Sequence, residues 1–280
     1  MREIAAEAIR DAVRDLCIEA NLNLPSDVAE RLRTGSVSEP WPGARATLER
    51  LVENFGLAAR EGTPICQDTG MACVFLELGQ DVGIVGGGLY DAVNEGVRRG
   101  YAEGFLRKSV VADPLRRRNT GDNAPAHIQV EIVPGNRLRL TAAPKGFGSE
   151  NMSRLAMLAP SAGEEGVKDF VVETARLAGS NPCPPMLLGV GIGGTFDRVA
   201  LLAKKALLRP LDQPHPDPYY AAMESELLER VNALGIGPQG FGGQTTALGV
   251  NIEIFPTHIA GLPVAVNINC HATRHASRLL

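Results

Sequence analysis

The sequence predicts an α/β fold: a mixed sheet with flanking helices and a helical N-terminal portion. In the first sixty residues, apolar side chains recur at the spacing of a helix face. From residue 61 on, short apolar or alternating runs of strand type are interspersed with helical stretches and glycine- and proline-rich turns. The 280 residues are 44% hydrophobic, enough for a sizeable core. We therefore expect one domain, 1–280, with a helical portion 1–60 and an α/β core 61–280.

Three helices are expected in the N-terminal portion. The first covers residues 3–20 and has Cys17 on its apolar stripe. The second begins at Ser26, whose hydroxyl is a good helix cap. The third covers residues 44–59, after a turn rich in proline.

Strands and helices alternate through the rest of the chain. Met71–Leu78 reads as a strand, and Gly86–Gly88 opens a helix. His127–Ile132 and Arg137–Leu140 alternate between apolar and polar residues around the turn Pro134–Asn136, which predicts a β-hairpin. Further helices are expected at 163–178, 197–208 and 220–234, and further strands at Met186–Val190, Thr246–Ile254 and Leu262–Ile268.

Charge and hydropathy exclude several classes of protein. A net charge of −4 and a pI near 5.8 argue against a general binder of nucleic acid or membrane surfaces. No apolar run approaches the roughly 18 residues that span a bilayer, and the acidic N-terminus is unlike a signal peptide. We expect a cytoplasmic protein, in which the five cysteines are free, metal-bound or catalytic.

The cysteines fall into two groups. Cys17 and Cys73 lie in apolar segments and read as core residues. Cys66, Cys183 and Cys270 lie in glycine- and proline-rich segments that read as loops. Three loop thiolates without an obvious fourth ligand suit an iron–sulfur cluster with one open iron. No C-x-x-C pair supports this, so burial as small hydrophobic residues stays the alternative.

Three glycine-rich segments suggest close approach of backbone to a ligand or partner. Gly189–Gly194 matches the dinucleotide pattern G-x-G-x-x-G, with Asp212 or Asp217 as the only ribose candidates. A nicotinamide-dependent oxidoreductase is therefore one alternative. The same loop, with Lys145–Asn151 and Gly235–Thr246, offers backbone N–H groups that bind anions such as carboxylates.

Several motifs together resemble the class I iron–sulfur fumarases and L(+)-tartrate dehydratases. The resemblance runs in order from about residue 40 to the C-terminus. It is carried by Pro64–Gly70, Lys145–Asn151, Asn181–Pro185, Gly189–Thr195, Gly237–Thr246, His258 and Asn269–His271.

This resemblance implies a [4Fe–4S] cluster held by Cys66, Cys183 and Cys270, with the fourth iron open to substrate. It implies the reversible hydration of fumarate to L-malate, or dehydration of L(+)-tartrate or a related 2-hydroxy dicarboxylate. The sequence ends ten residues after Cys270, as in the α subunit of the two-subunit form. We accordingly expect a separate β subunit, in an α2β2 assembly, to complete the site.

The resemblance also assigns roles to individual residues. Gln67 and Asp68 would face the substrate beside the cluster, and Arg107 would clamp a carboxylate. Gly146 would contribute backbone donors, and His258 would share proton handling with Asp68. The alternative from another class is a non-catalytic metal or iron–sulfur scaffold subunit.

Overall fold

The computed structural model describes all 280 residues and divides the chain into two compact units. Unit 1 comprises Met1–Pro25, Asn54–Phe147 and Arg274–Leu280, and unit 2 comprises Ser26–Glu53 and Gly148–Thr273. The expected helical portion 1–60 is thus divided between both units. The α/β class is confirmed, whereas a single domain over 1–280 stays a prediction.

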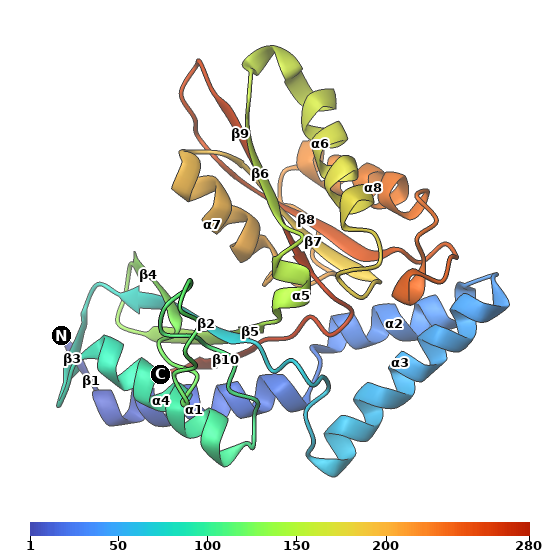
Figure 1. Ribbon diagram of the computed structural model, residues 1–280. Coiled ribbons are helices and arrows are strands. Elements are labelled where there is room, and N and C mark those ends of the chain that lie inside the picture. The colour runs from blue at the N-terminus through green and yellow to red at the C-terminus, as the bar shows by residue number, and fades with distance from the viewer. The chain divides into compact units, whose positions relative to one another are not determined.

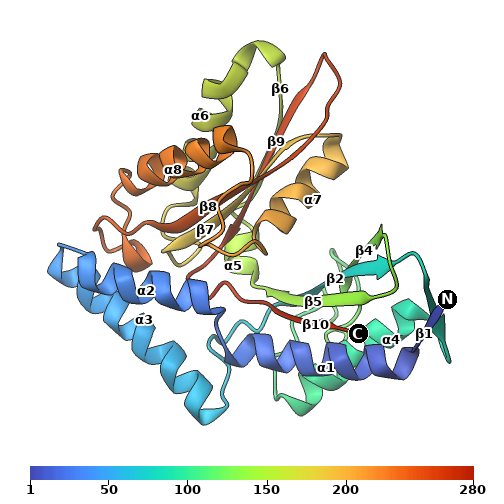
Figure 2. The ribbon, with the colours of Figure 1, turned by 180° about the vertical axis from the view of Figure 1, so that it is seen from behind.

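Unit 1 is a four-stranded sheet with two helices packed against one face (Figure 2). The strand order is β10-β5-β2-β4, and the short strands β1 and β3 form a separate parallel pair. Apolar side chains of α1 and α4 join those of β2 and β5 in one core. The bounds are β1 Arg2–Ala5, α1 Ala6–Leu22, β2 Met71–Gly79, β3 Val82–Val85, α4 Leu89–Glu103, β4 His127–Val133, β5 Leu138–Lys145 and β10 Ala276–Leu279.

The predicted hairpin between β4 and β5 is wrong, because β2 lies between these strands. β2 pairs with β4 in parallel and with β5 antiparallel. The turn wraps around the end of β2, where Gly79 and Asp81 donate backbone hydrogen bonds to Arg137 and Gly135. Alternation tells which face a side chain points to, but it does not identify the neighbouring strand.

Unit 2 is a three-layer arrangement around a second mixed sheet (Figure 1). The strand order is β6-β9-β7-β8, with α6 and α8 on one face and α7 on the other. The bounds are α2 Ser26–Ser38, α3 Pro42–Glu61, α5 Phe147–Glu150, β6 Arg154–Leu158, η1 Pro160–Ala162, α6 Gly163–Ala178, β7 Met186–Gly193, α7 Phe196–Ala206, α8 Pro218–Asn232, η2 Pro238–Gly240, β8 Ala247–Phe255 and β9 Leu262–Asn269. Both α3 and α5 continue across the limits of unit 2 into residues of unit 1.

The first two glycines of the dinucleotide-like pattern serve helix packing. A Cβ atom on Gly189 would lie 2.1 Å from the Ala203 carbonyl, and one on Gly191 would lie 2.3 Å from that of Val199. Only glycine lets α7 lie this close to β7. Asp217 caps α8 by accepting a bond from the Tyr219 N–H, 3.0 Å away, so it has a structural task. These contacts account for the first two glycines and for Asp217 without a nucleotide.

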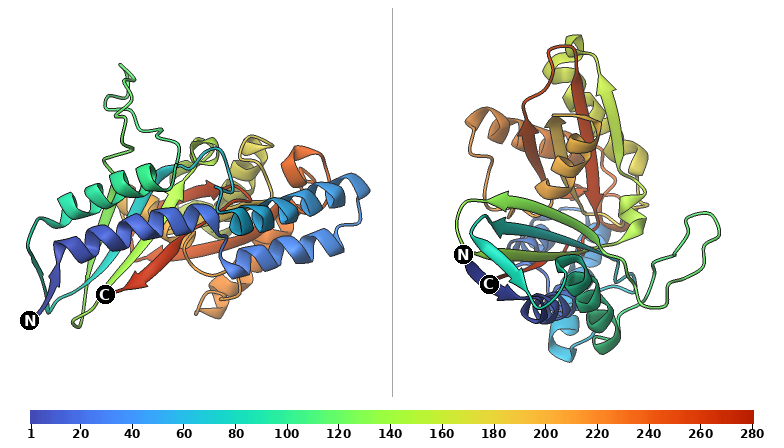
Figure 3. Two further views of the ribbon diagram at one scale, coloured as in Figure 1. Left: turned by 90° about the horizontal axis from the view of Figure 1, so that it is seen from below. Right: turned by 90° about the vertical axis from the view of Figure 1, so that its left-hand side faces the viewer.

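A long connection, residues 104–126, joins α4 to β4 and extends from unit 1 as an arm (Figure 3). The arm is ordered by its own bonds, including a bridge between Val111 and Asn119. Its exposed residues include Phe105, Leu115 and Arg117. Across the whole chain, no helix combines the length and the apolar character that a bilayer crossing requires.

Candidate active site

In unit 1, the residues after Cys66 form a tight loop around its sulfur. The Asp68 N–H points at Cys66 Sγ, 3.4 Å away, and such a donor stabilises a thiolate. Asp68 Oδ1 accepts the Gly70 N–H at 3.0 Å, and Oδ2 accepts the Phe147 N–H at 3.0 Å. Gly70 has φ +76°, and a Cβ there would lie 2.7 Å from the Lys145 nitrogen. The loop therefore fixes the direction of the Asp68 carboxylate.

Side chains from three other segments donate hydrogen bonds to backbone carbonyls of this loop. The Tyr101 hydroxyl donates to the carbonyls of Thr69 and Gly70, at 2.7 and 2.9 Å. Asn123 Nδ2 also donates to Gly70, at 3.1 Å, and Arg274 donates to the Asp68 carbonyl. Burial raises the pKa of Tyr101 well above its ordinary value, so its hydroxyl remains a donor.

The loop brings four of the other predicted residues of unit 1 around Cys66. The Thr69 hydroxyl donates to the Arg107 carbonyl at 2.9 Å, which places the Arg107 backbone beside the loop. A Cβ on Gly146 would lie 3.3 Å from Asp68 Oδ2. Gln67 and Arg107 are exposed, and neither side chain makes a hydrogen bond or ion pair in the structure.

In unit 2, the two remaining loop cysteines lie on neighbouring loops at the same end of strands β7 and β9. The His271 N–H donates to the Cys183 carbonyl at 3.3 Å, and His271 Nδ1 lies 3.0 Å from the same oxygen. Cys183 is exposed and has φ +54°, whereas Cys270 is partly buried. Residues 88 positions apart in the sequence are thus joined directly.

Gln239 bonds to both of these loops. Its backbone N–H donates to the Pro184 carbonyl at 2.7 Å, and its Nε2 donates to the same carbonyl at 2.9 Å. The same Nε2 lies 3.1 Å from His271 Nδ1. Pro184 and His271 are the immediate neighbours of Cys183 and Cys270.

A buried carboxylate fixes the other end of the Gln239 segment. Glu39 is 1% exposed and accepts the Gln244 N–H at 3.1 Å and the Thr245 N–H at 2.9 Å. The Thr245 hydroxyl also donates to it at 2.7 Å. Burial alone would raise the pKa of Glu39, but these hydrogen bonds outweigh burial and hold its pKa below the ordinary value.

The structure does not bring His258 to the Cys183 and Cys270 loops of the same chain. His258 is exposed in the connection between β8 and β9, before the first residue of β9. Cys270 follows the last residue of β9, Asn269. The seven residue steps from Leu262 to Asn269 span about 23 Å in a strand. His258 therefore lies near the opposite end of β9 from Cys270.

The interpretation of Cys17 and Cys73 as core residues is confirmed. Cys17, a residue of α1, is fully buried, and Cys73, a residue of β2, is 5% exposed. Burial raises the pKa of Cys17 to about 12, which keeps its thiol protonated and unreactive.

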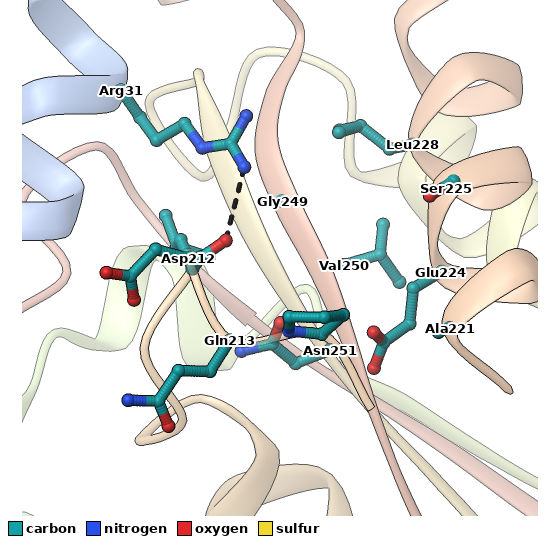
Figure 4. Close-up of a pocket in the computed structure, with 12 residues that line it drawn as sticks. Arg31, Asp212, Gln213, Ala221, Glu224, Ser225, Leu228, Gly249, Val250 and Asn251 are labelled. Carbon is teal, nitrogen blue, oxygen red and sulfur yellow. Dashed lines mark hydrogen bonds between the residues drawn. The ribbon is translucent and has the colours of Figure 1, made fainter. Parts of the chain in front are cut away.

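Unit 2 also has a polar pocket of about 200 Å³ beside β8 (Figure 4). Arg31 and Asp212 lie on one side of it, and Arg31 donates to the Leu211 carbonyl at 3.1 Å. Glu224, on the other side, accepts the backbone N–H of Ile252 at 2.7 Å, so it serves the fold. Asp212, the ribose candidate of the nicotinamide alternative, lines this pocket, whereas none of the residues assigned by the family resemblance does.

The chemistry of the three loop thiols is that of iron–sulfur ligands, although the structure gathers no three metal-ligating side chains in one place. Cys66, Cys183 and Cys270 all have some solvent exposure, unlike the two core thiols, and Cys66 Sγ already receives an N–H. Thiolate sulfur is the usual ligand of such clusters. Cys66 belongs to unit 1, and the other two belong to unit 2.

Sequence reasoning missed the residues that hold these loops. Arg274 and Asn123 act on backbone carbonyls, which leave no pattern in the sequence. A signal was available for Gln239, because a large polar residue stands alone among the glycines of 235–243.

Comparisons with known proteins identify the family of the chain. The sequence model described as fumarate hydratase (Fumerase) matches residues 10–278. A protein of Methanocaldococcus jannaschii, provisionally named L(+)-tartrate dehydratase subunit alpha, is 44% identical over 276 residues, which cover 96% of each chain. The L(+)-tartrate dehydratase subunit alpha of Escherichia coli K12 is 31% identical over 283 residues, covering all of this chain and 93% of the relative. On this evidence the chain belongs to the fumarate hydratase (Fumerase) family, as its motifs had indicated.

Proposed function

We propose that the chain is the α subunit of an iron–sulfur hydro-lyase that reversibly removes water from a 2-hydroxy dicarboxylate. The observation that carries this proposal is the Cys66 loop, where a thiol, an exposed amide and an oriented carboxylate are consecutive residues. Family membership supports the reaction class. The α names of the relatives support a separate β chain.

We assign Cys66, Cys183 and Cys270 as the cluster ligands. When bound, a [4Fe–4S] cluster with an open iron would supply a Lewis acid for the leaving hydroxyl. The chain's own residues bind and orient the substrate around it. Arg107, with its unpaired guanidinium, is suited to grip one carboxylate, and the exposed Gln67 amide can donate to the substrate.

Asp68 is the candidate proton carrier. Each of its oxygens accepts one backbone N–H and keeps a second lone pair, so it can hold a proton without losing its orientation. Gly146 lies beside Oδ2 and leaves room for a substrate group where a side chain would intrude. The β chain would complete the site.

For His258 we infer a role from a second α chain, because β9 separates it from Cys270 in its own chain. An α2β2 assembly holds two such chains. Mixing inactive Cys183→Ser and His258→Ala subunits with β should then restore activity, since each supplies what the other lacks. No restored activity in a mixture shown to exchange subunits would remove His258 from proton handling.

The substrate is assigned to a class, with two named candidates. Fumarate and L-malate follow from the family description, and L(+)-tartrate follows from the names of the relatives. The two 2-hydroxy acids, L-malate and L(+)-tartrate, differ by one hydroxyl group.

The test is anaerobic reconstitution with iron and sulfide, followed by assays with and without the β chain. We expect a cluster absorption spectrum from α alone, poor turnover alone, and turnover of fumarate or L(+)-tartrate with β. Full specific activity from α alone would refute the need for β. A cluster without turnover of either acid in the complex would favour the scaffold alternative.

A further inference from the structure

Gln239 is held in a conformation that its neighbours could adopt at lower cost. Its backbone has φ +54° and ψ +14°, the left-handed region that disfavours residues with a Cβ. Gly237, Gly240, Gly242 and Gly243 also have positive φ, so the segment uses glycine at its other left-handed positions. A glutamine kept under strain at this place implies that its side chain has a task.

The side chain amide of Gln239 contacts both loops. Its Nε2 donates to the Pro184 carbonyl at 2.9 Å and lies 3.1 Å from His271 Nδ1, which itself lies 3.0 Å from the Cys183 carbonyl. The carbonyl can only accept, so the amide cannot be turned around. The bonds therefore tie the residue after Cys183 to the residue after Cys270.

The segment that carries Gln239 is itself well anchored. The Glu39 carboxylate accepts the backbone N–H groups of Gln244 and Thr245, and the Gly237 N–H donates to the Thr246 hydroxyl at 3.1 Å. Because this segment is fixed, the Gln239 amide can act as a rigid spacer between the Cys183 loop and the Cys270 loop.

We propose that Gln239 is a positioning residue that sets the separation of the Cys183 and Cys270 thiols. The inference deepens the proposed function, because these thiols are two of the three assigned cluster ligands. It concerns the protein before any iron is bound, and it can be tested there.

The decisive variant is Gln239→Gly. Glycine relieves the left-handed strain, so the apoprotein should melt at the same temperature or higher, while the amide is lost. A purely structural role predicts a lower melting temperature instead. Gln239→Glu is the second variant, because it keeps the size of the side chain and removes both donors. Gln213→Ala is the matched control, since Gln213 is exposed and its side chain makes no hydrogen bond.

The first measurement needs no cluster. In a Cys66→Ser apoprotein, dibromobimane should bridge Cys183 and Cys270, and its fluorescence reports the double alkylation. We expect roughly tenfold slower bridging in Gln239→Gly and Gln239→Glu, corresponding to the loss of about one net hydrogen bond. Unchanged bridging in a folded variant, or no bridging in the parent, would overturn the proposal.

The second measurement is iron retention by the reconstituted protein with Cys66 intact. Release of iron to a chelator should be roughly tenfold faster in both variants and unchanged in the control. Equal release in Gln239→Gly and wild type would also overturn the proposal. If no variant or parent ever binds iron, the proposed function fails, while the bridging result still decides the role of Gln239.

Discussion

The Cys66 loop of unit 1 and the Cys183 and Cys270 loops of unit 2 are held by different means. Tyr101, Asn123 and Arg274 come from three separate segments and all bind carbonyls of the Cys66 loop. The unit 2 loops bind each other and share one amide. The first arrangement uses side chains from three segments, whereas in the second a single amide reaches both loops. A single substitution in unit 1 should therefore loosen the Cys66 loop only in part, whereas loss of the shared amide in unit 2 should disturb both cysteine loops there.

The largest effect is expected at the cysteines, where the two units should behave alike. Replacing Cys66, Cys183 or Cys270 by serine should abolish cluster retention and activity, because each removes one assigned thiolate. Iron and sulfide content and the absorption spectrum measure this. Cys73→Ala and Cys17→Ser are the controls and should retain the cluster. A cluster that survives in Cys183→Ser would remove that residue from the ligand set.

The second-largest effect is expected on catalysis, from Arg107 of unit 1. Arg107→Ala should leave the cluster intact and lower kcat/KM by roughly 10- to 100-fold, because a charge-assisted bond to the substrate is lost. Steady-state kinetics of the αβ complex measure it. Arg116→Ala, on the same exposed arm, should behave as wild type. Unchanged kcat and KM in Arg107→Ala would exclude Arg107 from the site.

Redundancy in unit 1 is tested by Tyr101→Phe. Losing the hydroxyl weakens two buried hydrogen bonds, and we expect a loss of about 1–3 kcal/mol in the free energy of unfolding. The cluster should still bind, because Asn123 continues to hold Gly70. Denaturant unfolding of the apoprotein gives the value, with the exposed Tyr90→Phe as control. Cluster loss in a folded Tyr101→Phe protein would contradict the redundancy.

The smallest effect concerns pH and Glu39. Its pKa is lower in the folded than in the unfolded protein, so its contribution is complete above the ordinary value of 4.5 and disappears as pH falls through the folded pKa. Glu39→Gln should lower the free energy of unfolding by about 1–3 kcal/mol at neutral pH, because the charge is lost and one of the two accepting oxygens becomes an NH2 donor that faces backbone N–H groups. Unfolding curves of both proteins should converge below pH 4.5. If the two proteins still differ in their free energy of unfolding at lower pH, the charge of Glu39 is not responsible for the difference.

The sequence allowed most helices, and the division of the cysteines into core and loop residues, to be predicted, because both are local properties. Periodicity over residues 163–178 predicted α6 with its observed bounds. It could not show that β2 separates β4 from β5, since strand neighbours are chosen by the whole core. Short strands such as β10 carry too few residues for a pattern. The positions of Gln239 and His258 relative to Cys270 depend on sheet order, which no motif encodes.

Unit 1 is built from three pieces of chain, and its edge strand β10 pairs with β5 across more than a hundred intervening residues. During synthesis, α1 and the Cys66 loop must wait for residues 274–280 before Arg274 and β10 can close them. Unit 2 likewise needs a late segment, because its inner strand β9 ends at Asn269. Closure of the Cys66 loop therefore requires Arg274, 206 residues after Asp68, and a chain that stops before residue 274 would lack both this bond and strand β10.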